Sequence, residues 1–165
     1  MLFRSAAGGV AAERGRILTA ILLRHPALLH EVDHAYGSLE LPPMLTRMRE
    51  AIRAWVDHAD VLDSAALMNH LTVSGMAADV EQVLGAMPFP LPAYASPSAM
   101  PAEAEAGWWH IFGFLNLDRL RDEVASARSA ASLSLTPETQ RRAIALKEAW
   151  DRVIAGESDG THPAA

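Results

Sequence analysis

The strongest helical pattern in the chain covers Pro101 to Ala131. The first part of this stretch is apolar on almost all sides of a helix, as is typical of a helix that is buried on most sides. Its apolar residues are Trp108, Trp109, Ile111, Phe112 and Leu115. In the second part the apolar positions narrow to one stripe with 3-4-3 spacing, which indicates contact with one partner helix. The stripe consists of Leu117, Leu120, Val124 and Ala127. We therefore expect a single long helix that begins in a bundle and continues as one arm of a projecting hairpin.

Further helices follow from the same periodicity of apolar positions, which is the primary sequence signal for an amphipathic helix. They are expected over residues 12–25, 26–36, 42–58, 63–72, 77–87 and 136–155. No alternating run of β-branched residues is present, so the predicted fold class is all-α. The expected architecture is a helical bundle of five to six helices, then the long helix and an antiparallel C-terminal helical hairpin. The predicted organisation is a lead-in over 1–11, a bundle over 12–115, a hairpin over 116–155 and a flexible tail over 156–165.

Two polar residues mark the starts of predicted helices. Asp63 and Thr136 are suitable N-cap residues because their side-chain oxygens accept a free backbone N–H group, and Pro137 suits the first helical position. Residues 88–97 are rich in proline and are expected to form an extended connector.

With the turn fixed before Thr136, antiparallel packing predicts a register for the hairpin. It pairs Leu117 with Val153, Leu120 with Trp150, Val124 with Leu146 and Ala127 with Ala143.

Composition narrows the classes of function. The chain has 165 residues, no cysteine and a net charge of −6. The lack of cysteine excludes disulfides, thiol catalysis and cysteine-ligated zinc, and it fits a cytoplasmic location. The chain has no apolar run of about 18 residues and no signal-peptide pattern, so secretion and membrane spanning are not expected. Proteins that hold nucleic acid by its phosphates usually present a basic face. We therefore expect a protein partner and no direct nucleic-acid binding.

One short motif points to catalysis. Residues 30–34 read His-Glu-Val-Asp-His and match H-E-x-x-H, in which His30 and His34 would bind zinc and Glu31 would act as the general base. The context argues against a zinc hydrolase, because Pro26 leaves barely one helical turn before His30. The sequence has no Gly-rich phosphate loop, no G-x-S-x-G and no D-x-D pair. We predict no catalytic residue, metal or cofactor, and keep the zinc hydrolase as the least favoured alternative.

Several segments together resemble a known family. The stretch from Arg16 to Leu29 is similar to an R-x-L-x-x-L-L-x-x-P-x-L-L pattern. The other matching segments are Leu41-Pro-Pro-Met-Leu45, Asp63 to Leu71, the Trp108-Trp109 pair that enters the long helix, and Leu133-Ser-Leu-Thr-Pro-Glu138. In this order they resemble the C-terminal helicase-binding domain of bacterial DnaG-type DNA primases, over roughly residues 12–155. The proline-rich segment 88–97 departs from that family's pattern.

The resemblance implies a role in DNA replication. Such a domain docks on the N-terminal domains of the hexameric replicative helicase and recruits RNA primer synthesis to the fork, forming a primosome. The domain is not itself an enzyme, although the whole primase would be a DNA-directed RNA polymerase. The bundle also resembles the helicase's own N-terminal domain, so one alternative is that the chain is that helicase domain. A second alternative is a free-standing helical adaptor with an unknown partner. The Trp108-bearing helix with a hairpin partner favours the primase.

The hairpin supplies the candidate partner-binding residues. Leu133 and Leu135 lie at the expected tip, where apolar side chains are costly unless something covers them. Basic side chains lie off the seam and would form a rim, as in interfaces with an apolar centre and a polar edge. The full set is Leu133, Leu135, Arg141, Arg142, Lys147 and Arg152. Alternatively, Leu133 and Leu135 fold back to seal the turn.

Overall fold

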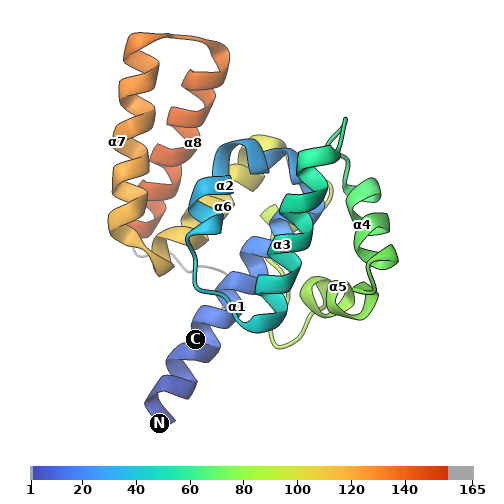
Figure 1. The fold of residues 1–165 in the computed structure, drawn as a ribbon. Helices are drawn as coiled ribbons and strands as arrows, with labels where there is room; N and C mark the ends of the chain where they lie inside the picture. Colours follow the sequence, from blue (N-terminus) through green and yellow to red (C-terminus); the bar gives the residue numbers. More distant parts are fainter. Residues whose placement is uncertain (1, 156–165) are drawn as a thin grey trace.

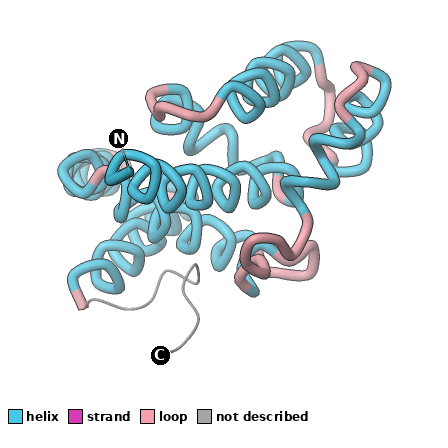
Figure 2. The backbone as a smooth tube through the Cα atoms, turned by 90° about the horizontal axis from the view of Figure 1, so that it is seen from below, coloured by secondary structure: helices cyan, strands magenta, loops and turns pink. Residues whose placement is uncertain are grey.

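A computed structural model describes residues 2–155, apart from the side chains of residues 2–8, 118 and 119. The described part is all-helical, with no strand, so the predicted all-α class is confirmed (Figures 1 and 2). The expected tail over 156–165 lies outside the described residues. The α-helices are α1 (Leu2–Arg24), α2 (Leu29–Gly37), α3 (Pro43–His58), α4 (Ser64–Val73), α5 (Ala77–Leu84), α6 (Pro101–Leu115), α7 (Leu117–Leu133) and α8 (Pro137–Ile154). Short 3-10 turns occupy η1 (Pro26–Leu28) and η2 (Ala93–Ala95).

The central element of the bundle is α1. Residues 15–23 of this helix are buried, and α3, α4, α5 and α6 pack around it. The expectation of a non-helical lead-in over 1–11 is wrong for residues 2–11, because α1 already begins at Leu2. The first turns of α1 project away from the body of the molecule (Figure 1). Glycine has a low helix propensity, but alanine, which is frequent in the neighbouring positions, has a high one. The helix continues through both Gly8 and Gly9.

Local capping signals were predicted correctly. The Asp63 carboxylate accepts a hydrogen bond from the Ala65 N–H at 3.3 Å. Thr136 forms a capping box with Thr139, whose backbone N–H donates to the Thr136 hydroxyl at 3.1 Å. Proline occupies the first turn of α8 as expected. These contacts involve residues only two or three positions apart, and this is why the sequence alone could identify them.

A buried arginine holds the proline-rich connector against α1. Arg16 donates hydrogen bonds to the carbonyl oxygens of Val83 at 2.7 Å, Gly85 at 2.8 Å and Phe89 at 2.6 Å. Its charge is balanced by Glu13, one turn earlier, at 2.6 Å. The connector is non-helical as expected, apart from η2. Arg16 therefore stabilises a segment that has few backbone hydrogen bonds of its own.

The predicted continuous helix over 101–131 is wrong, because the chain turns at Asn116. This residue has φ −157° and ψ 69°, outside the helical region, and separates α6 from α7. A Cβ at Gly113 would lie 2.7 Å from Leu120 Cδ2 and 2.8 Å from Val153 Cγ2, so α7 and α8 fold back tightly against the end of α6. The Asn116 side chain makes no capping hydrogen bond to α7, and the apolar spacing continues across this residue, so the sequence did not indicate the break.

The three last helices form one packed unit. Helix α8 contacts α6 as well as α7, and α6 also contacts α1, so α6 links the bundle to the hairpin (Figure 1). Leu120, Val124, Ala127 and Leu146 of the expected seam are buried, but Leu117 is 42% exposed, contrary to expectation. Ala145 and Ala149 are also buried, because α8 faces two helices and not one. Within the described residues no helix is both long and apolar enough to span a membrane.

Candidate interaction site

The tip of the α7–α8 hairpin presents two exposed leucines. Leu133 is 88% exposed and Leu135 is 75% exposed, so neither side chain folds back to seal the turn. The turn is closed by polar contacts instead: the Thr139 hydroxyl donates to the Ser134 carbonyl oxygen at 2.8 Å, within the Thr136 capping box. The leucines are therefore not needed to build the turn, and they form an apolar surface at the outer end of the hairpin, away from α4 and α5 (Figure 1).

Arg142 lies at the inner side of the hairpin and not on its outer rim. Its guanidinium group donates to the Glu31 carboxylate at 2.8 Å, to the Glu31 carbonyl oxygen at 3.0 Å and to the Glu123 carboxylate at 2.9 Å. It also lies 5.9 Å from the centre of the Trp109 ring, within the range of a cation–π contact. One side chain of α8 thus joins α2, α6 and α7.

Arg141 is also engaged within the chain. Its guanidinium group donates to Glu105 Oε1 at 2.7 Å and lies 3.9 Å from Glu31 Oε1. The Arg141 side chain is 40% exposed, so it covers Glu105 while keeping one side in solvent. The expected basic rim at the tip therefore does not include Arg141 and Arg142 as free cations, since both already pair with carboxylates of the bundle and the hairpin.

Glu105 is the most unusual member of this cluster. It lies on α6 within the run Ala104–Gly113, all of which is buried, and its own side chain is 0% exposed. Burial raises the pKa of the Glu105 carboxyl above the ordinary glutamate value, and the nearby Arg141 opposes that rise. Glu105 Oε2 finds no hydrogen-bond partner among the described residues. A buried carboxylate of this kind needs the adjacent guanidinium group to offset the loss of water.

The sequence did not reveal this cluster, which combines three carboxylates with two guanidinium groups. Its members are Glu31, Glu105, Glu123, Arg141 and Arg142. A usable signal was present: Glu105 stands within a run of small and apolar residues that ends in Trp108-Trp109, where a charge is rarely buried without a partner. The partner itself was not deducible, because Arg141 lies 36 residues away along the chain.

Lys147 and Arg152 lie apart from the tip. Lys147 is 60% exposed and its amine lies 4.0 Å from Asp151 in a weak ion pair along α8. Arg152 is partly exposed in the last turn of the same helix. Ten residues separate Lys147 from Pro137 at the start of α8, a distance of about 15 Å along a helix. The six candidate residues therefore divide into an apolar tip, an internal arginine pair and two outer cations of α8.

The side chains of the H-E-x-x-H motif do not have the arrangement of a zinc-binding site. His30 and His34 are exposed on α2, whereas Glu31 points to α8 and binds both Arg142 and, more distantly, Arg141. These ion pairs occupy the carboxylate that a zinc hydrolase would use as its general base. Among the residues with described side chains, no group of three or more His, Cys, Asp or Glu residues is arranged to hold a metal ion.

No family model, curated protein or solved structure matches this chain.

Proposed function

We propose that the chain is a protein-interaction domain without catalytic activity, which docks on the N-terminal domains of the hexameric replicative helicase and links primase to it. The observation that carries this proposal is the pair of exposed leucines, Leu133 and Leu135, at the end of a projecting hairpin. Exposed apolar residues in contact with water are costly unless a partner covers them, and such residues are common at the centres of interfaces. The resemblance to the helicase-binding domain of DnaG-type primases supplies the identity of the partner.

Within this proposal the six candidate residues have different roles. Leu133 and Leu135 contact the helicase directly. Arg141 and Arg142 act indirectly, because their ion pairs with Glu105, Glu31 and Glu123 fix the hairpin against the bundle. Lys147 and Arg152 lie farther along α8, away from the tip, and form the outer edge of the contact. Their contribution is expected to be small and to weaken with salt, as is typical of charges at an interface rim.

A binding assay with purified hexameric helicase tests the proposal. The double substitution Leu133→Ser with Leu135→Ser should weaken binding by at least about tenfold, since burial of one leucine side chain is worth about 1.5–3 kcal/mol. The matched control is Val61→Ser with Val73→Ser, because these valines are also highly exposed but lie on the bundle, in the loop before α4 and at its last residue. The control variant should bind as tightly as the unaltered chain.

Both variants should retain the helical circular dichroism and melting temperature of the unaltered chain, because all four side chains are exposed. Equal loss of binding in the two variants would show that general surface hydrophobicity, and not the tip, drives the association. Undiminished binding of the tip variant would place the contact elsewhere on the molecule. No binding of the unaltered chain would refute the helicase as partner.

A further inference from the structure

A groove of about 320 Å³ runs between α8 and the first turn of α6. Its middle part along α8 is apolar and includes Ile144, whose side chain is 51% exposed. Met100, the N-cap residue of α6, stands two residues before the groove and is 62% exposed. The lining ends at Pro137, so the leucines of the hairpin tip are not part of it. The groove is lined by Ala102, Pro137, Gln140, Arg141, Ile144, Ala145 and Glu148.

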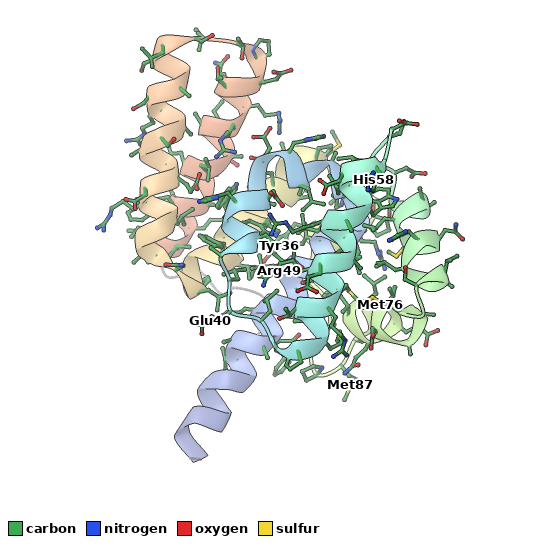
Figure 3. The ribbon with its side chains drawn as sticks, viewed as in Figure 1. Tyr36, Glu40, Arg49, His58, Met76 and Met87 are labelled. Atoms are coloured by element: carbon green, nitrogen blue, oxygen red, sulfur yellow. The ribbon has the colours of Figure 1, made fainter. Side chains whose placement is uncertain are left out.

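Arg141 lines this groove with hydrogen-bonding capacity to spare. Arg49, in the bundle, shows an arginine used fully for packing, because it lies over the Tyr36 ring and donates to the Tyr36 carbonyl oxygen at 2.9 Å (Figure 3). Arg141 is 40% exposed and makes one hydrogen bond to the described side chains, from Nη1 to Glu105 Oε1 at 2.7 Å. Its Nη2 remains 3.9 Å from Glu31 Oε1. A guanidinium group has five N–H donors, so Arg141 can bind a further carboxylate.

Glu148 supplies the opposite charge at the other end of the apolar part. It is exposed and makes no ion pair with any residue whose side chain is described. Arg141 and Glu148 are seven residues apart on α8, about 10 Å along a helix, so they cannot neutralise each other within one chain. Ile144 and Ala145 lie midway between them. The exposed face of α8 therefore presents a cation, an apolar centre and an anion in that order.

This order of charges selects the kind of helix that fits the groove. A helix that packs antiparallel on α8 needs an anion opposite Arg141, apolar residues at the centre and a cation opposite Glu148. Helix α8 has this order itself when it is read in the reverse direction. A parallel copy of α8 would instead place like charges opposite each other. The groove is therefore complementary in charge to an antiparallel copy of its own helix.

We propose that α8 packs antiparallel against α8 of a second copy of this chain. The two-fold axis passes between Ile144 and Ala145, and the contact is isologous because the same surface of each copy takes part. Arg141 of each copy pairs with the partner's Glu148, and the two Ile144 side chains fill the apolar centre. Ala102 and Ala145 are small and allow close approach of the helices. The contact is independent of the helicase proposal, since the tip leucines lie outside the groove.

Sedimentation equilibrium of the full chain at micromolar to millimolar concentrations tests this proposal. The unaltered chain should form dimers. Glu148→Lys places like charges opposite each other at both ends of the contact, and should raise the dissociation constant of the dimer at least about tenfold. The matched control Glu81→Lys makes the same charge change at an exposed position of α5, and should leave that constant unchanged within about twofold. A chain that is monomeric throughout, or equal weakening by the two variants, would overturn the proposal.

Disulfide cross-linking tests the position of the axis. The chain has no cysteine, so a single introduced thiol can form a disulfide only between two copies. Ile144→Cys should give a covalent dimer under mild oxidation, because the two thiols would lie beside the axis and a disulfide needs Cβ atoms within about 4.5 Å. Leu133→Cys is the matched control on the same hairpin; although Leu133 is 88% exposed, this variant should remain monomeric. Equal or faster cross-linking of the Leu133→Cys variant would overturn the proposed pairing.

Discussion

The tip of the α7–α8 hairpin and its bundle-facing side break the usual rule of burial in opposite ways. At the tip, Leu133 and Leu135 expose apolar side chains to solvent. On the bundle-facing side, Glu105 is fully buried and is covered by Arg141, while Arg142 joins Glu31 and Glu123. The buried charge has an explanation within the chain, because these ion pairs connect α2, α6, α7 and α8. The tip has none, because the turn is closed without its leucines. Exposed apolar residues that the fold does not require are therefore better candidates for a functional contact than a buried charge that stabilises the packing.

Leucines in the buried seam and at the exposed tip should respond to the same substitution very differently, and this is the largest effect that we expect. Leu146→Ala, in the buried seam of α8, should lower the free energy of unfolding by about 2–5 kcal/mol. Leu133→Ala, at the tip of the same hairpin, should change it by less than about 0.5 kcal/mol. Urea unfolding followed by circular dichroism measures both. Similar losses would mean that the tip leucine is part of the core.

Removing the cation that joins three helices should give the next largest effect. Arg142→Ala leaves Glu31 and Glu123 without their closest ion-pair partner, and should lower the free energy of unfolding by about 2 kcal/mol. The loss is smaller than for a fully buried pair, because solvent reaches part of the cluster. Lys147→Ala is the matched control on the same helix, and it should cost less than about 0.5 kcal/mol. An Arg142→Ala variant with an unchanged free energy of unfolding would argue against a positioning role for this residue.

Glu105 should make stability depend on pH in a predictable direction. Its folded-state pKa is raised above the ordinary value of 4.5, so the folded chain binds a proton more readily than the unfolded chain. The contribution of Glu105 to stability is therefore fully present below about pH 4.5 and is lost as the pH rises through the folded-state pKa. Relative to Glu105→Gln, the unaltered chain should become more stable as the pH falls toward 4.5. Melting temperatures of both proteins, measured from neutral pH down to about pH 4.5, test this prediction. A difference in melting temperature that does not change with pH would contradict it.

The smallest expected effect concerns the exposed histidines of α2. The double substitution His30→Gln with His34→Gln should leave the melting temperature unchanged, with or without added zinc, since both side chains face solvent and Glu31 is engaged by Arg142. A melting temperature that rises with stoichiometric zinc only in the unaltered chain would restore the metal site as an explanation of this motif.

The sequence predicted well those features that depend on near neighbours. Helix periodicity and the caps at Asp63 and Thr136 involve residues only a few positions apart, and the structure has both. The break at Asn116 was missed, because apolar spacing continues on both sides of it and the change in direction depends on packing near Gly113. The roles of Arg141 and Arg142 were missed for a related reason. Arg141 pairs with Glu105, 36 residues away along the chain, and Arg142 pairs with Glu31, 111 residues away.

We propose that the tip contacts the helicase, while the ion pairs on the bundle-facing side of the hairpin only position the tip. Site-specific photo-crosslinking tests this most directly, with benzoylphenylalanine placed singly at positions 135 and 61 and purified hexameric helicase added. Both positions are exposed and apolar in the unaltered chain. We expect a covalent adduct with the helicase from position 135 and none from position 61. An adduct from position 61, with none from position 135, would contradict it.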